Sequence, residues 1–400
     1  LPGTLLVNDG LLFDTQWLLD HGGFGTPTTF NSYFNDNPIP GTGPYVVTAV
    51  SENNYVEFSQ NPTYWGDTLT PAQIAEQPLF DPGHVKNVII YAKLDDLARY
   101  TDLASGAVQI AAIRSADWNL IQADTAKYSF FTNPPWGGLV SALGLNTQLY
   151  PTNITAVRQA IVHSLNYTDI AQKAFLGEMS SYVGPEYPAW KNFYDLGNFS
   201  QYSYNTTLAT QLLTQANVTS PTLTMYIASS CSFCTNLAEA VQSDLSIVGI
   251  NVQISVEGPT EFYTPYGSYS SEIPVASQIG NLVAYFGSWA PGTLTPADYW
   301  ETFVSNESLI GNTAIYYNPV VQAAVNAFTT STNITYIQGL VEKAQAQIYT
   351  DAPYAWLGVP KLWYSDGSLV WQKGVISGFE VDPVWSGMDT APIFNTVTFG

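Results

Sequence analysis

The chain has 400 residues, of which 46% are apolar, so it can bury one sizeable hydrophobic core and has room for two. Its 11 basic residues stand against 32 acidic ones, and the formal net charge of −21 argues against nucleic acid and anionic membrane surfaces as partners. No apolar run reaches the ~18 to 20 residues of a membrane-spanning helix. Only 11% of the residues are charged, which is typical of exported proteins, so we expect a globular protein that works outside the cell.

The first part of the chain alternates turn-rich and β-prone segments. Residues 1–40 are rich in turn signals and are expected to form a connector. The β-branched and aromatic residues at 45–50 and 55–58 flank a four-residue turn, which predicts a hairpin. Three further segments then predict a β-α-β order: a strand at 84–92, a helix at 94–106 closed by a glycine, and a strand at 107–113.

The rest of the chain is richer in helices. Apolar residues recur at helical spacing in 155–165, 208–217 and 335–353. A strand at 221–228, a helix within 237–249 and a strand at 249–256 predict a parallel β-α-β unit, because so short a crossover returns to the same sheet. The economical architecture is therefore two α/β lobes split near residue 145, and a cleft between lobes is the default ligand site.

The two cysteines, Cys231 and Cys234, stand at C-x-x-C spacing in SSCSFCTN, just before a predicted helix. A redox pair, half of a metal site and a static disulfide are all compatible with this spacing. Zinc is disfavoured because it needs four ligands and the histidines lie far away in sequence. A helix N-terminus would lower a thiol pKa, but the residues around the pair differ from a thioredoxin motif. We favour a static disulfide that pins a loop in an oxidising compartment.

The sequence also carries seven Asn-x-Ser/Thr sequons, which are acceptor motifs for N-glycosylation. Chance supplies many such motifs in a chain rich in Asn, Ser and Thr, so the sequons permit glycosylation without requiring it. They lie at Asn153, Asn166, Asn198, Asn205, Asn217, Asn306 and Asn333.

Several short motifs occur in an order that resembles family 5 extracellular solute-binding proteins, the oligopeptide- and dipeptide-binding components of ABC importers. Each motif is weakly specific, and the specificity lies in their shared order over essentially the whole chain. They are GTGPYVV at 41–47, NPTYWG at 61–66, LASGAVQIA at 103–111, GLN at 144–146, VRQAIVHSLNYTDIAQKAFLGE at 157–178, LAEAVQSDLSIVGINVQI at 237–254 and YTDAPYAWLGVPKLWYS at 349–365.

This resemblance implies a two-lobed α/β fold of the periplasmic-binding-protein type (type II, cluster C-like) with a hinge between the lobes. In the family, the Gly-Thr-Gly-Pro-Tyr segment follows well over a hundred residues, whereas here it follows 40. We therefore expect that an N-terminal part of the family fold is missing from this chain. The expected organisation is a connector or the end of a small appended domain at 1–40, part of lobe I at 41–145, lobe II at 146–385, and a return to lobe I at 386–400.

The resemblance also implies a function without catalysis. Such proteins close two lobes around a solute and present it to the membrane subunits of an ABC importer. We expect an oligopeptide or an oligosaccharide as ligand, no cofactor and no bound metal, a monomer, and attachment to the outer cell surface.

The segment AYFGSWAPGTLTPADYW at 284–300 looks like the Gly-Trp loop that lines the cleft in this family. In peptide-binding relatives an Asp shortly after this Trp pairs with the peptide's amino group, but the first acid after Trp289 is Asp298. Oligosaccharide binders instead stack indole rings on sugars, and this chain has 11 Trp and 26 Tyr. The candidate ligand-binding residues are Trp289 and Trp136 as the preferred platforms, followed by Tyr285, Thr293, Asp298 and Trp385.

Two other classes of protein compete with this interpretation. A secreted acidic glycosidase would need two carboxylates about 5 to 5.5 Å or ~6.5 to 9.5 Å apart, and the sequence marks no such pair beyond guesses such as Glu186 and Asp298. A surface-layer or filament protein would share the acidity and the sequons. The shared order of the family motifs argues against both.

Overall fold

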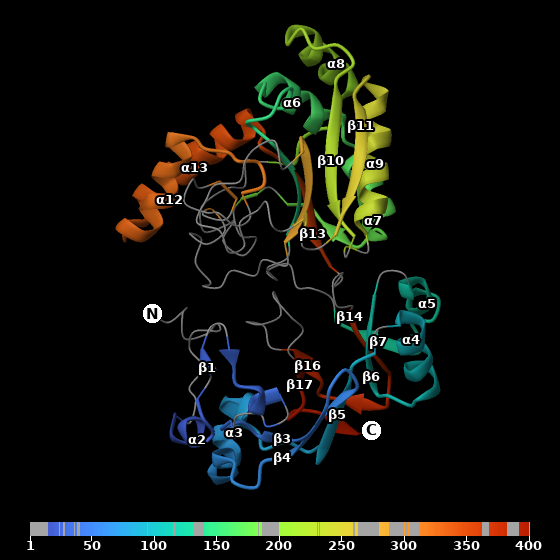
Figure 1. Cartoon of the computed structure of the whole chain (residues 1–400), viewed down its shortest axis with the longest axis vertical. Coiled ribbons are helices and arrows are strands. Elements are labelled where there is room, and N and C mark those ends of the chain that lie inside the picture. The colour runs from blue at the N-terminus through green and yellow to red at the C-terminus, as the bar shows by residue number, and fades with distance from the viewer. Residues whose placement is uncertain are drawn as a thin grey trace. The chain divides into compact units, whose positions relative to one another are not determined.

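The structure is a computed structural model of the whole chain (Figure 1). The residues that it describes are 15–23, 25–26, 29–35, 37, 41–93, 95–114, 117–131, 140–182, 184–185, 200–229, 231, 233–258, 261–262, 280–287, 300, 303–304, 312–361, 368–381 and 392–399.

The chain forms two compact units, and unit 2 is inserted into unit 1. Unit 1 comprises residues 1–131 and 368–400, and unit 2 comprises residues 132–367. The first boundary falls before residue 140 rather than near residue 145, because strand β8 (Val140–Leu145) lies inside the sheet of unit 2. The chain returns to unit 1 at residue 368 rather than 386, because strand β14 (Ser368–Gln372) pairs with two strands of unit 1.

The N-terminal segment of unit 1 contains regular structure, although the sequence predicted only a connector there. Trp17 and Tyr33 pack around the ring of His21, whose centroid lies 4.2 Å from that of Trp17. The elements are helix α2 (Thr15–Asp20), the hairpin β1 (Gly25–Thr26) and β2 (Thr29–Phe30), and the 3-10 helix η2 (Ser32–Asn35).

The predicted hairpin is present as β3 (Tyr45–Ser51) and β4 (Tyr55–Gln60), and the φ of +57° at Asn53 allows the turn between them. Strand β5 (Asn87–Tyr91) pairs with β4 and leaves its other side unpaired within the described residues. Three of its side chains, Ile89, Ile90 and Tyr91, are exposed. The elements between β4 and β5 are η3 (Trp65–Thr68), α3 (Pro71–Glu76) and η4 (Pro78–Phe80).

The second sheet of unit 1 joins distant parts of the chain. Helix α4 (Asp96–Ser105) begins at the side-chain cap of Asp95 and ends at Gly106, whose φ is +81°. The strand that follows α4, β6, pairs with β14 rather than with β5, in the order β6-β14-β7. The remaining elements are β6 (Ile110–Ile113), α5 (Trp118–Gln122), β7 (Tyr128–Phe130), β15 (Ile376–Ser377), β16 (Glu380–Val381), β17 (Pro392–Ile393) and β18 (Thr398–Phe399).

Unit 2 is built on a six-stranded mixed sheet of order β11-β10-β12-β8-β13-β9. The predicted parallel pair is confirmed, because β10 and β11 run parallel from Thr222↔Asn251 to Ala228↔Glu257. Every residue of β8 and β13 is buried, as expected for central strands covered on both faces. The strands are β9 (Met179–Ser180), β10 (Thr222–Ala228), β11 (Asn251–Glu257), β12 (Leu282–Gly287) and β13 (Tyr354–Pro360).

Helices cover both faces of this sheet: α7 and α9 lie on one side, and α12 and α13 on the other (Figure 1). Apolar residues at helical spacing, such as Leu237, Val241 and Leu245 of α9, are fully buried. Aromatic side chains fill the opposite face, where Phe303 packs edge-on against Tyr354 and Trp356. The helices are α6 (Thr155–Ser164), α7 (Tyr167–Phe175), α8 (Thr206–Gln215), α9 (Cys234–Ile247), α12 (Pro319–Thr330) and α13 (Ile334–Asp351).

Candidate functional site

At one edge of the unit 2 sheet, the end of β12 lies beside the beginning of β8. Strands β8 and β12 are antiparallel, and their register runs from Leu282↔Leu145 to Gly287↔Val140. The end of β12 and the beginning of β8 therefore lie side by side. In the sequence, Trp289 follows Gly287 by two residues and Trp136 precedes Val140 by four.

Three other strands also end at this edge. Strand β10 is parallel to both β11 and β12 and ends at Ala228. Strand β13 is antiparallel to β8, so its carboxyl end at Pro360 points the same way. Strand β11, which follows α9, pairs with one side of β10, and strand β12 pairs with the other side. The strand order therefore reverses direction at β10. In α/β sheets, ligands bind outside the carboxyl ends of strands at such a switch point.

Both links between the units also leave from this edge, because β8 is the first strand after residue 131 and β13 is the last before residue 368. The described polar groups here include backbone amides and a few side chains. Ser229 N–H donates to Glu257 O at 2.8 Å, and Lys361 Nζ lies 3.6 Å from Glu178 Oε2. Ser141 is fully buried, and its Oγ has no hydrogen-bond partner within the described part of the chain.

Most of the predicted ligand-binding residues lie outside the part of the chain that the structure describes. Trp136, Trp289, Thr293, Asp298 and Trp385 lie outside the described residues, as does Glu186 of the glycosidase alternative. Tyr285 is opposite Ala142 in the β12–β8 ladder, while its side chain is not among those described. Their roles in binding remain predictions.

The Cys231–Cys234 pair lies at the same edge, directly after β10. The structure joins the two sulfur atoms, with the Cα atoms 5.4 Å apart, and Cys234 begins α9. Between them, the buried Phe233 packs on Phe175 of α7, with ring centroids 4.7 Å apart. Sequence reasoning singled out the cysteines but did not connect their loop with the ligand site. The signal was the predicted β-α-β unit, because the loop of such a unit lies at the carboxyl edge of its sheet.

The sequons fall into distinct structural settings. The side chains of Asn166, Asn205 and Asn333 cap the N-termini of α7, α8 and α13 by accepting backbone N–H bonds. Asn153 and Asn217 are exposed. The sequons at Asn198 and Asn306 lie outside the described residues.

At the opposite end of the sheet, where β8 ends and β13 begins, a buried arginine that sequence reasoning missed ties three segments of unit 2 together. Arg158 of α6 donates to Asp351 O and Thr152 O, both at 2.8 Å, and to Thr155 Oγ1 at 3.0 Å. Burial lowers the pKa of Arg158, and the charge of Asp351 opposes that shift. The Asp351 carboxylate accepts a hydrogen bond from Tyr316 Oη at 2.7 Å. The pKa of Tyr316 is raised well above its ordinary value, mainly by burial and also by the Asp351 carboxylate.

A second buried polar group joins α7 to α9. Asp244 of α9 is 6% exposed and accepts the backbone N–H of Asn166 at 2.7 Å. Burial raises the pKa of Asp244, the Asn166 hydrogen bond lowers it, the charge of Asp169 raises it and Lys173 lowers it. Elsewhere, no three His, Cys, Asp or Glu residues cluster in the part of the chain that the structure describes.

The sequence profile described as "Bacterial extracellular solute-binding proteins, family 5 Middle" matches residues 23–309. This match covers most of the chain and includes the β8–β12 ladder and the Cys231–Cys234 loop. It stops before α12, α13 and the return to unit 1.

Three curated proteins illustrate the sequence similarity. Di/tripeptide-binding protein 2 of Pseudomonas aeruginosa (strain UCBPP-PA14) is 26% identical over 55% of this chain and 38% of its own length. Glutathione-binding protein GsiB of Pectobacterium atrosepticum is 23% identical over 84% of this chain and 61% of its own length. The nickel-binding periplasmic protein of Escherichia coli is 24% identical over 60% of this chain and 46% of its own length. The chain thus spans less than two thirds of the length of each of these relatives.

Among solved structures, a putative peptide-binding protein AppA from Clostridium difficile superposes with a TM-score of 0.73 at 17% identity. The superposition covers 92% of this chain and 69% of AppA. At this level of identity the likeness establishes the fold, which is the two-lobed fold of periplasmic binding proteins.

Proposed function

The chain belongs to the bacterial extracellular solute-binding proteins of family 5, and from this premise we propose that it captures a short peptide and delivers it to the membrane subunits of an ABC importer. The family consists of solute-binding components rather than enzymes. The proposed site is the carboxyl edge of the unit 2 sheet, where β10, β12 and β13 end and β8 begins.

The observation that carries the proposal is the β8–β12 register, with Gly287 opposite Val140. This register supports a site in which Trp289 and Trp136 approach the same solute from two different loops, with Tyr285, Thr293, Asp298 and Trp385 as further contacts. Two of the relatives carry names that describe di- or tripeptide and glutathione binding, and these names support a peptide as the cargo.

An oligosaccharide is the second candidate ligand. The segment after Trp289 reads Ala290-Pro291-Gly292-Thr293, so no acid follows closely to hold a peptide amino group. Aromatic platforms with neutral polar neighbours suit sugar rings, because indole faces stack on apolar sugar faces and hydroxyls bind polar side chains.

We further propose that the protein works outside the cell as a monomer attached to the cell surface, with the Cys231–Cys234 disulfide formed and with N-linked glycans on some of its sequons. The family description supports an extracellular location. In the described portion, no helix combines the length and the hydropathy that a membrane crossing requires.

A ligand screen by thermal unfolding tests the proposal. A ligand at 100 times its Kd adds about 2.7 kcal/mol to the free energy of unfolding, which raises Tm measurably. Di- and tripeptides, di- to tetrasaccharides and Ni²⁺ would be compared on the same preparation. Stabilisation by peptides supports the first candidate and stabilisation by saccharides supports the second. A response to Ni²⁺ alone, or to none of the three, contradicts both.

A further inference from the structure

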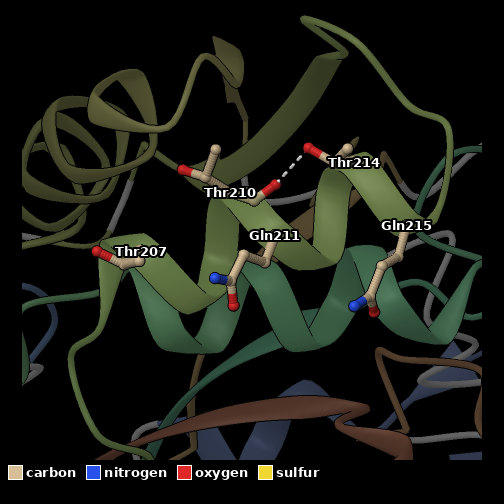
Figure 2. A pocket seen from close by; sticks show the side chains of 5 residues that line it. All are labelled: Thr207, Thr210, Gln211, Thr214 and Gln215. Atoms are coloured by element: carbon tan, nitrogen blue, oxygen red, sulfur yellow. Dashed lines mark hydrogen bonds between the residues drawn. The ribbon is translucent and has the colours of Figure 1, made fainter.

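The exposed face of α8 is a neutral polar surface in an otherwise acidic protein. Residues 196–238 contain no Asp, Glu, Lys, Arg or His, although the chain as a whole carries a net charge of −21. An open hollow of about 510 Å³ runs along this helix. Its lining residues recur at helical spacing on one face and are Thr207, Thr210, Gln211, Thr214 and Gln215 (Figure 2).

The lining side chains offer hydrogen-bonding groups without charge. Thr214 Oγ1 donates to Thr210 O at 2.9 Å (Figure 2). Thr210 Oγ1 donates to Thr206 O, also at 2.9 Å, so both hydroxyl oxygens can still accept. Within the described residues, the side chains of Gln211 and Gln215 make no hydrogen bond, and both are exposed. Neutral donors and acceptors on an open surface suit the hydroxyl groups of sugars better than ions.

A sequon stands at each end of this helix. Asn205 is the N-cap residue of α8, and its Oδ1 accepts the N–H of Leu208 at 2.9 Å. Asn217 follows the helix by two residues at an exposed turn. The side chains of Asn217 and of Thr219, which completes its sequon, form no hydrogen bond among the described residues, and both are exposed.

The other described sequons have their polar side chains engaged. Asn166 and Asn333 accept backbone N–H bonds as helix caps. The sequon of Asn153 contains Thr155, whose hydroxyl accepts a bond from the buried Arg158. Among the sequons that the structure describes, that of Asn217 is therefore the one whose Asn and Thr are both exposed and unengaged.

We propose that Asn217 carries an N-linked glycan whose first sugars lie along the α8 hollow. This inference rests on the proposed N-glycosylation and assigns it to one site. The hollow begins two residues from Asn217, and the helical rise from Gln215 back to Thr207 is roughly 12 Å, so a chain of a few sugars can span it. The sugar hydroxyls would bind the free amides of Gln211 and Gln215 and the hydroxyl oxygens of the threonines.

The attachment requires a phosphate-activated, lipid-linked oligosaccharide as donor. The bond between the anomeric carbon and the phosphate oxygen breaks, and a bond from that carbon to Nδ2 of Asn217 forms. The amide nitrogen loses one proton, and the lipid phosphate leaves.

Site occupancy is tested on protein isolated from the cells that make it. Mass spectrometry of the intact protein and of its glycopeptides would compare the Thr219→Ala variant, which destroys the sequon but keeps Asn217, with the matched Thr219→Ser variant, which preserves the sequon. We expect Thr219→Ala to lose the mass of one glycan and Thr219→Ser to retain it. Glycans at other sequons with none at Asn217 would overturn the assignment alone. No glycan at any sequon would overturn the proposed glycosylation as well, and solute binding in the thermal screen would be unaffected by either result.

The position of the glycan is tested by cysteine labelling, because both native cysteines are paired. Gln211→Cys places a thiol in the hollow, and Glu342→Cys places one on the exposed face of α13. In the Thr219→Ser background we expect a maleimide to label Gln211→Cys severalfold more slowly than in the Thr219→Ala background, with no difference for Glu342→Cys. Equal rates at Gln211→Cys in both backgrounds would show that the glycan does not cover the hollow.

Discussion

Gly287, the last residue of β12, pairs with Val140, the first residue of β8, so that two loops distant in sequence begin at neighbouring points of one sheet edge. The proposal that Trp289 and Trp136 contact the same solute depends on this pairing.

The first prediction concerns these platforms. We expect Trp289→Ala and Trp136→Ala each to weaken binding of the peptide or saccharide found in the screen by about tenfold or more, because loss of a buried aromatic contact costs on the order of 1 to 2 kcal/mol. Isothermal titration calorimetry would measure both Kd values. Tyr336→Ala, an exposed aromatic change on α13, is the control and should leave Kd unchanged. Unchanged affinity in both tryptophan variants would move the ligand site elsewhere.

The second prediction concerns Arg158. Replacement by Met removes three hydrogen bonds and leaves the carbonyls of Thr152 and Asp351 without this donor, so we expect a loss of about 3 to 5 kcal/mol in the free energy of unfolding. Arg158→Lys keeps the charge but not the planar fork, and should recover only part of that loss. Urea unfolding measures the difference. The exposed Lys343→Met change serves as control, within about 0.5 kcal/mol of the parent. A similarly small effect at Arg158 would contradict the structural role assigned to it.

The third prediction concerns the pH dependence of stability. Burial raises the folded-state pKa of the Asp244 carboxyl above its ordinary 3.8. The folded protein therefore holds the carboxyl proton of Asp244 more tightly than the unfolded chain does. The stability from this group is present below 3.8 and is lost as pH rises through the raised value. Asp244→Asn keeps an acceptor for Asn166 N–H but cannot ionise, so its stability relative to the parent should rise across that window.

Chemical unfolding at a series of pH values would measure this difference. Asp244→Ala is the comparison, because it removes the acceptor altogether and should lose about 1 to 3 kcal/mol at every pH. Parallel stability curves for the parent and Asp244→Asn would show that Asp244 has no raised pKa in the folded state.

The fourth prediction concerns the unpaired side of β5. The backbone groups of Ile89 and Tyr91 make no hydrogen bond besides those of the β4–β5 ladder in the described region, and both side chains are exposed. Such edges pair with other chains. The working form is proposed to be a monomer, and we expect self-association through this edge only at high concentration, where Ile89→Lys should increase the monomer fraction measured by light scattering. Leu97→Lys adds the same charge on α4 and should have little effect. A parent protein that stays monomeric throughout would refute this expectation.

Local patterns predicted the helices and strands well. The periodic apolar residues of 155–165, 208–217 and 335–353 correspond to α6, α8 and α13, and the expected hairpin is β3–β4. Each of these elements depends on a face or a turn that its own residues specify. The parallel pairing of β10 and β11 also follows from the order of elements along the chain. Two strands joined by a single short helix in one sheet run parallel.

Long-range pairing was beyond such reasoning. Strand β6 pairs with β14, which lies more than 250 residues further along the chain, and no local feature of 110–113 selects that partner. The same holds for the β8–β12 ladder that defines the candidate site. Arg158 escaped notice because a lone arginine on a helix usually lies at the surface, and its buried partners are backbone carbonyls that leave no mark in the sequence.

The strand by which the chain enters the sheet of unit 2 and the strand by which it leaves are neighbours, which is the arrangement of an inserted domain. The first strand to enter it and the last to leave it are hydrogen-bonded neighbours, with Ser141 opposite Gly358, so its two ends emerge close together. Domains with neighbouring ends tolerate excision and insertion into other hosts. A gene segment for residues 132–367 should therefore yield a folded module by itself, and an ancestral protein could have acquired or exchanged that module without disturbing the strands that surround it.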